Sequence, residues 1–403
     1  MRFFHRVTSS ATAAILAVGG LALASATPAQ AKPLGFKQTN ACAAAPAGFA
    51  RCMAVVRTKI TALTASGDAI TPNATSPSGK SPANLVSAYS LPSSTAGSGQ
   101  TVAIVDAYND PYAEADLAVY RSYFGLSACT TANGCFKKVN QTGGTSYPTN
   151  SASWSEEISL DIDMVSAVCP NCKILLVEAT TASFANLGTA VNEAAALGAN
   201  AISNSYGSSS DASDATYGSY YNHSGIAVTA SSGDSGYGAS YPASSHYVTA
   251  VGGTTLTAAS STTRGWTETA WSSAGSGCST YNTVLTGQAS FSTGCTKRAE
   301  ADVSAVADPA TGVSVYDSYA YLGSSGWLTF GGTSVSSPII ASVFALAGNA
   351  ASIDNNYPYT NYTSLYDVTS GSNGTCTTSQ WCTARAGWDG PTGLGTPNGV
   401  GAF

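Results

Sequence analysis

Two acidic residues stand at a spacing that could support proton transfer. Glu157 and Asp161 lie four residues apart in an otherwise apolar stretch, so a helix there places both carboxylates on one face. That face also carries Val165, which would normally point inward. Paired carboxylates in such a place share protons, and one pKa rises, which gives a base or acid usable at mildly acidic pH. The alternative interpretation is that both acids lie at a solvated helix N-terminus, where negative charge is favourable. It would account well for the position of Glu157 and poorly for that of Asp161.

A serine stands where a nucleophile could be placed. Ser334 follows a Gly-Gly-Thr turn and precedes an apolar run, residues 339–348, that we expect to form a buried helix with Pro338 in its first turn. Glycines in the turn allow another group to approach the backbone closely. The same pattern also fits a Thr/Ser cap on a core helix. Whether Ser334 is a nucleophile therefore depends on catalytic partners elsewhere in the chain.

A third candidate, Asp234, directly follows an apolar strand in the sequence Ser-Ser-Gly-Asp-Ser-Gly. Loops at the carboxyl ends of parallel strands build the sites of open α/β sheets. An Asp there can form an Asx turn, or, when protonated, it can donate a hydrogen bond to a developing oxyanion.

Histidine offers little support for a Ser-His-Asp triad. The chain has three histidines, and His5 falls in a segment expected to be removed; His223 and His246 read as turn residues. The general base is therefore sought among the carboxylates.

The N-terminus carries the pattern of a secretory signal peptide over residues 1–31, with early arginines, an apolar core and a small-residue cleavage site. No later stretch is long enough to span a membrane, so we expect a secreted protein. Secretion favours disulfides. The ten cysteines fall into five close pairs, and nearest-neighbour bonding is expected: 42–52, 129–135, 169–172, 278–295 and 376–382.

Charge excludes one class of partner. Charged residues make up 9% of the chain and the formal net charge is −6, without a basic stripe that would bind nucleic acid. We expect a monomer that binds neither nucleic acid nor membrane.

The rest of the chain indicates an α/β protein. Residues 32–80 suggest a short pro-segment or N-terminal extension, with a helix-like apolar patch over 53–60. From residue 81 to 403, strands at 101–106, 173–178, 201–206, 226–230 and 247–251 alternate with helices at 113–123, 156–168 and 185–197. This alternation predicts a mostly parallel, doubly wound sheet flanked by helices, with disulfide-closed loops.

These motifs, in this order, resemble those of the sedolisins, serine-carboxyl peptidases with a subtilisin-like fold. The resemblance covers about residues 81–403 and includes the Glu157/Asp161 helix, the Asp234 turn and the Ser334 turn, together with segments 301–309 and 387–395. Sedolisin precursors usually carry a long prodomain, and residues 32–80 are too short for one.

The resemblance implies a role for each residue. Ser334 would be the nucleophile, Glu157 the base and Asp161 the group that orients it. Protonated Asp234 would donate to the oxyanion together with the Ser334 N–H. Asp106 and Tyr206 would support the site from behind. The implied activity is cleavage of proteins or peptides at acidic pH, where a carboxylate is a better base than a charged histidine.

The resemblance also implies one structural Ca²⁺. Its expected ligands are oxygens, as this ion prefers. They are the carboxylates of Asp367 and Asp389 and the backbone carbonyls of Val368, Arg385 and Gly387.

Two alternatives remain. A His-based subtilase would share the Gly-Thr-Ser turn and could use Asp106, but it needs a glycine-rich His motif that the sequence lacks. A secreted binding domain could keep the same fold without activity.

Overall fold

A mostly parallel β-sheet runs through the centre of the structure, a computed structural model that describes residues 1, 35–59, 62–63, 69–70, 75–321 and 323–403. Residues 2–31 of the predicted signal peptide lie outside the described residues. In spatial order the strands are β13 (Trp266–Ala270), β12 (Thr249–Ala258), β11 (Ala227–Ser231), β9 (Ala201–Asn204), β6 (Thr101–Ala107), β8 (Lys173–Ala179) and β7 (Phe136–Asn140), with β16 (Val303–Val306) also paired to β12. All these pairings are parallel except that of β13 with β12.

The parallel strands are buried apolar runs, as expected for a sheet covered on both faces. Strand β6, for example, is buried from Val102 to Ala107. The predicted sheet is confirmed, with strand ends shifted by a few residues. The strand expected at 201–206 divides at Ser205 into β9 and the short β10 (Tyr206–Gly207).

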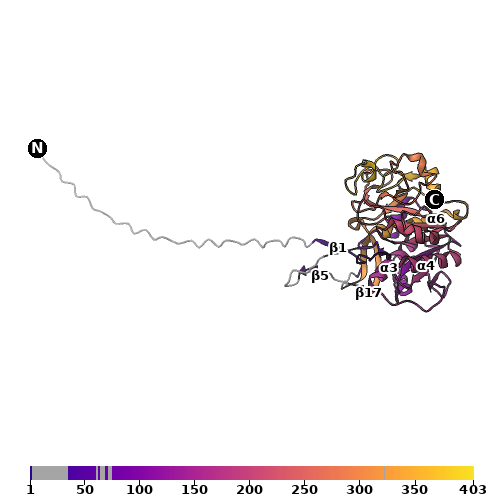
Figure 1. Cartoon of the computed structure of the whole chain (residues 1–403). Helices are drawn as coiled ribbons and strands as arrows, with labels where there is room; N and C mark the ends of the chain where they lie inside the picture. The colour runs from indigo at the N-terminus through magenta and orange to yellow at the C-terminus, as the bar shows by residue number, and fades with distance from the viewer. Residues whose placement is uncertain (2–34, 60–61, 64–68, 71–74, 322) are drawn as a thin grey trace. The chain divides into compact units, whose positions relative to one another are not determined.

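The helices are α1 (Pro82–Tyr89), α2 (Ala113–Tyr123), α3 (Ala152–Val168), α4 (Phe184–Ala196), α5 (Asp214–Tyr217), α6 (Thr333–Ala347) and α7 (Tyr357–Thr360). Of these, α3, α4 and α6 pack against strands of this sheet. Helices α3 and α6 contact each other, α6 lies over β9, β11 and β16, and α4 lies over β6 and β8. The C-terminus lies beside α6 (Figure 1), where the rings of Phe403 and Phe344 pack with centroids 5.2 Å apart.

Helix α6 begins earlier than the sequence suggested. Its first residue is Thr333, so Pro338 is in the second turn and not the first. A proline there cannot donate to the carbonyl four residues back, which belongs to Ser334. The Ser205 hydroxyl lies 3.4 Å from that carbonyl oxygen and replaces part of the lost contact.

A second, antiparallel sheet has the strand order β1 (Phe36–Asn40), β3 (Val55–Lys59), β18 (Ser324–Gly331) and β17 (Val313–Tyr321). The expectation of a helix-like patch over 53–60 is therefore wrong. Its apolar residues Val55 and Val56 pair with the end of β18. β-branched residues favour a strand once such a partner exists, and the partner is more than 250 residues away in sequence.

Short paired strands complete the fold. They are β2 (Arg51–Cys52) with β10, β14 (Gly277–Cys278) with β15 (Ala299–Glu300), β19 (Leu365–Tyr366) with β20 (Thr396–Pro397), and β4 (Ala62–Leu63) with β5 (Ala69–Ile70). The five predicted disulfides are all present. None of the described helices is long and apolar enough to cross a membrane.

Candidate active site

Ser334 is fully buried as the second residue of α6, at the point where β18 turns into the helix. Its hydroxyl donates to the Ser205 carbonyl oxygen over 3.2 Å. As a first-turn residue it has no intrahelical partner for its backbone N–H. The residue before the helix, Gly332, has a φ of 95° that only glycine adopts readily. A Cβ at this position would lie 1.9 Å from the Met53 carbonyl oxygen and 2.8 Å from Asp234 Oδ2.

Helix α3 brings Glu157 and Asp161 to the same region, because it packs directly on α6. Both side chains are fully buried, which excludes the solvated helix start as an explanation. Burial, followed by the nearby charge of Asp106, raises the pKa of each well above its usual value. The neighbouring Glu157 carboxyl raises the pKa of Asp161 further, while the Ser205 hydroxyl, which donates to Asp161 Oδ1 at 2.9 Å, lowers it.

Hydrogen-bond donors near Glu157 oppose the effect of burial on its pKa. The Ser334 hydroxyl and the Ala54 backbone N–H lie near Glu157 and lower its pKa, in opposition to burial. Neither Glu157 oxygen has a partner at full hydrogen-bond geometry, so these are close approaches that can tighten. Because neighbouring carboxyls repel each other, the cluster holds a single negative charge most easily, and Glu157 is the member of the pair that lies beside the Ser334 hydroxyl.

Behind this pair lies a second pair of carboxyls. Asp106 on β6 and Glu178 on β8 occupy the same register position of neighbouring strands. Burial and then Glu178 raise the pKa of Asp106. Glu178 forms an ion pair with Lys138 at 3.1 Å, yet burial still raises its pKa to about 7. The sequence reasoning missed Glu178, although acids at the ends of two buried strands were a usable signal.

Asp234 faces the start of α6 from the loop after β11. Its Oδ1 accepts from the backbone N–H and the hydroxyl of Thr333, both at 2.8 Å. The residue is partly exposed to the pocket that it lines, and desolvation of the carboxyl raises its pKa to about 7. At acidic pH it is therefore protonated. With Oδ1 occupied as an acceptor, the proton belongs on Oδ2, which points at the space beside Gly332.

Neither described histidine contacts this cluster. The His223 ring bonds to the Tyr220 carbonyl oxygen at 2.9 Å, and His246 lies 3.3 Å from the Asn282 side chain. Within the described residues, Ser334 therefore lies near carboxyl groups, and neither His223 nor His246 bonds to it. Tyr206 is also buried, with its hydroxyl donating to Asn204 at 2.7 Å.

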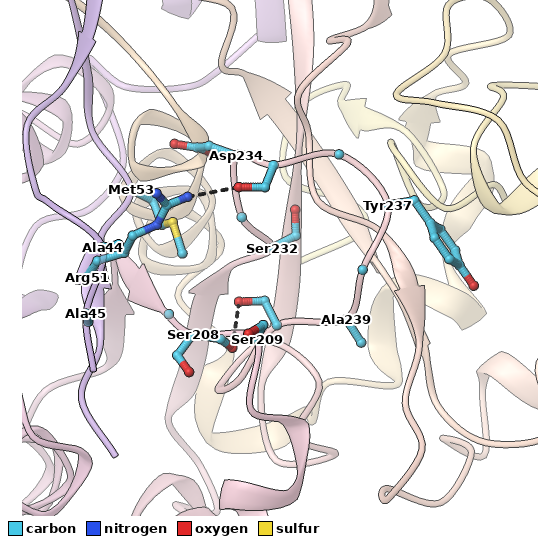
Figure 2. Close-up of a pocket in the computed structure, with 16 residues that line it drawn as sticks. Ala44, Ala45, Arg51, Met53, Ser208, Ser209, Ser232, Asp234, Tyr237 and Ala239 are labelled. Atoms are coloured by element: carbon cyan, nitrogen blue, oxygen red, sulfur yellow. Dashed lines mark hydrogen bonds between the residues drawn. The ribbon is translucent and has the colours of Figure 1, made fainter. Parts of the chain in front are cut away.

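A pocket of about 320 Å³ opens beside the cluster. Its walls come from the segment after β10, from residues 232–240 around Asp234, and from the N-terminal residues 44–53 (Figure 2). Among the lining residues only Arg51 and Asp234 carry charge. The pocket is therefore suited to an uncharged side chain.

The residues of the expected calcium site lie together in the C-terminal loops. The Asp367 carboxylate accepts from the Gly387 N–H at 2.9 Å, and Asp389 accepts from the Arg385 N–H at 3.0 Å. Burial raises the pKa of Asp389 to about 7, and the charge of Asp367 adds to that rise. Among the described residues no group of three or more His, Cys, Asp or Glu gathers here. The two carboxylates repel each other, and with the carbonyl of Val368, next to Asp367 in the chain, they would offer the oxygen ligands that Ca²⁺ takes.

The chain belongs to the subtilase family: residues 127–386, more than half of its length, match the sequence model of that family. It is similar to kumamolisin of Bacillus sp. (strain MN-32), with 29% identity over 362 residues covering 80% of this chain and 63% of kumamolisin. The chain thus spans less than two thirds of the length of this relative.

Solved structures agree with this assignment. A Pseudomonas sedolisin, described as a serine-carboxyl proteinase in complex with two molecules of pseudo-iodotyrostatin, shares 25% identity at a TM-score of 0.68 over 80% of this chain and 96% of that one. An S41 psychrophilic protease, at 18% identity and a TM-score of 0.50 over 80% and 99% of the two chains, supports the fold alone. The predicted sedolisin resemblance and subtilisin-like fold are confirmed.

Proposed function

We propose that this protein is a secreted serine-carboxyl endopeptidase that hydrolyses peptide bonds in proteins at acidic pH. The observation that carries the proposal is the burial of Glu157 and Asp161 beside Ser334, with no histidine bonded to that serine. The similarity to kumamolisin and to a sedolisin supports the same class.

In the proposed reaction, Glu157 takes the proton of the Ser334 hydroxyl as its oxygen attacks the substrate carbonyl carbon. Protonated Asp161 holds Glu157 in place. The tetrahedral oxyanion accepts from the Ser334 N–H and from Asp234 Oδ2–H, which lies at the space beside Gly332. Glu157 then passes its proton to the leaving amine, and water hydrolyses the acyl-enzyme by the same route in reverse.

The pH window follows from which groups must be charged. Unperturbed carboxyls titrate at about pH 3–5, where activity was expected from the sequence. Because burial raises the pKa of Glu157 well above its usual value and the base must be ionised, we expect the optimum at or above the upper end of that range. Asp234 sets the alkaline limit, since it must stay protonated.

The test is cleavage of an acid-denatured protein by the purified chain. Ser334→Ala and Glu157→Gln should each abolish cleavage. Matched controls are Ser342→Ala, on the same helix and with an unpartnered hydroxyl, and Glu156→Gln, which neutralises a buried acid whose pKa burial already raises. A folded wild-type protein that cleaves nothing would identify a silent domain, and activity in Ser334→Ala would contradict the assigned nucleophile.

We also propose that one structural Ca²⁺ binds between Asp367 and Asp389, with carbonyl oxygens of Val368, Arg385 and Gly387. A cation there would offset the repulsion of the two carboxylates and link the loops that carry them. Added Ca²⁺ should raise the melting temperature of the wild type, and Asp389→Asn should remove that rise. Asp354→Asn, in an exposed turn, is the control.

A further inference from the structure

An N-terminal segment occupies the cleft of the candidate active site. Residues 41–59, here called the strap, run antiparallel to β10, with Cys52 opposite Tyr206 and Arg51 opposite Gly207. They then pair with the end of β18, where Val55 lies opposite Gly331. The two residues between these pairings are Met53 and Ala54, so this peptide bond crosses the start of α6.

The groups around that bond are those of the proposed mechanism. The Met53 N–H donates at 3.1 Å to the Ser205 carbonyl oxygen, which also accepts from the Ser334 hydroxyl. The Met53 carbonyl oxygen lies in the space between Gly332 and Asp234 Oδ2. These contacts hold the carbonyl where an oxyanion would be stabilised.

The other side of the bond faces the base. The Ala54 N–H lies near Glu157 and lowers the pKa of that carboxyl, as the Ser334 hydroxyl does. A base positioned between the nucleophile and the leaving nitrogen can move a proton from one to the other. The Met53–Ala54 bond is thus surrounded by nucleophile, oxyanion donor and base at the same time.

Side chains of the strap, Arg51 and Met53 among them, also line the cleft (Figure 2). Met53 is buried, and its terminal methyl comes within 3.1 Å of a Cβ placed on Gly207 at the pocket wall. Arg51 donates to the Ser235 hydroxyl at 3.0 Å. The disulfide Cys42–Cys52 closes the strap into a loop next to the bond and limits its freedom.

We propose that Met53–Ala54 is the chain's own cleavage site, and that the strap fills the substrate cleft until this bond is cut. The inference rests on the proposed function. Ser334 Oγ bonds to the Met53 carbonyl carbon, the carbon–nitrogen bond breaks, and Glu157 gives its proton to the Ala54 nitrogen. Water then releases Met53 with a free carboxylate, and Ala54 becomes a new N-terminus.

The pocket next to Met53 also gives the substrate class. An unbranched apolar residue fits on the acyl side of the cut bond, because the lining offers small residues and little charge. A carboxylate brought there would be desolvated beside Asp234. Peptides with Met in this place should be cleaved, and peptides with Asp there should be cleaved at least about tenfold more slowly.

The experiment follows the intact full chain at acidic pH by mass spectrometry and N-terminal sequencing, alongside cleavage of a Met-Ala reporter peptide. We expect Ala54 to appear as a new N-terminus at a rate that tenfold dilution does not change, and reporter cleavage to rise with it. Met53→Asp should slow both at least about tenfold, whereas Ala43→Asp, which adds the same charge at an exposed strap position, should slow neither.

The outcomes separate the two proposals. Reporter cleavage by a chain whose strap stays intact, or is cut elsewhere, overturns the inference and leaves the proposed function standing. A dilution-dependent rate also overturns it, because the bond would then be cut by another molecule. A folded chain that cleaves neither strap nor reporter overturns the proposed function itself. Ser334→Ala should remain at full length.

Discussion

Replacing Asp234 by asparagine tests the proposed oxyanion donor most directly. The Thr333 N–H and hydroxyl both donate to Oδ1, and an asparagine keeps that acceptor. Its amide nitrogen would stand at Oδ2 and donate toward the oxyanion at any pH. We therefore expect Asp234→Asn to stay active, and to lose the alkaline limit that the wild type owes to this carboxyl.

The size of the wild-type loss of activity at alkaline pH follows from the pKa of Asp234, which is about 7. Above that value the protonated fraction falls about tenfold per pH unit, so roughly 1% of Asp234 remains a donor at pH 9. The Arg51 charge lowers the pKa of Asp234, so loss of the strap, which carries Arg51, would raise that pKa. Water admitted to the open cleft would stabilise the carboxylate and lower it, so the two changes oppose each other. Half of Asp234 is protonated at pH 7, so wild-type kcat/KM should fall about 50-fold between pH 7 and 9, beyond any change in the asparagine variant.

Alanine at the same position is the comparison. Removal of one oxyanion donor costs about 10²–10³ in kcat, or about 2.7–4 kcal/mol, and this loss should appear at every pH. The assay is kcat/KM for a short chromogenic peptide from pH 3 to 9, with melting curves to confirm folding of each variant. The reasoning is refuted if Asp234→Asn is as inactive as Asp234→Ala, or if it keeps the wild-type alkaline limb.

Three further predictions concern stability. Arg298 and Asp302 form a fully buried ion pair at 2.7 Å, so Arg298→Met should lower the free energy of unfolding in urea by about 3–5 kcal/mol; a loss below about 1 kcal/mol would contradict this. Burial raises the pKa of Asp110 to about 6, of Glu178 to about 7 and of Asp317 to about 8. These acids are stabilising when neutral, so their contribution is complete below about pH 4 and is lost as pH rises through 6–8; the melting temperature at constant ionic strength should fall over that range, and a rise would refute the assignment. Finally, EGTA should lower the melting temperature at pH 6, and no change would contradict the proposed calcium site.

Local patterns were sufficient to place much of the candidate site. Glu157 and Asp161 could be paired from sequence because helical spacing fixes their common face. Asp234 could be placed because it follows a buried strand of the parallel sheet, where strand ends build sites. Ser334 follows β18 of the antiparallel sheet, and its glycine turn before an apolar helix was the signal that located it. Only the structure, however, brings Asp106 and Glu178 into register behind them.

Long-range pairing was not accessible in the same way. The run around Val55 has no periodicity that identifies its partner, and its pairing with Gly331 depends on contacts formed far along the chain. Pro338 was placed one turn too early, because the polar residues Thr333 to Ser337 hid the true helix start. The hydroxyls of Ser336 and Ser337 bond to neighbouring strands, which local helix rules do not register.

The position of the Cys42–Cys52 disulfide determines what a cut at Met53–Ala54 would leave behind. Both cysteines precede the cut, so no covalent bond would join residues 35–53 to the remainder of the protein. That fragment would still be held by β1, whose five residues pair with β3. It would act as a reversible product inhibitor, and its departure would obey mass action. A freshly cut sample should therefore gain further specific activity on dilution, because dilution favours release of the fragment.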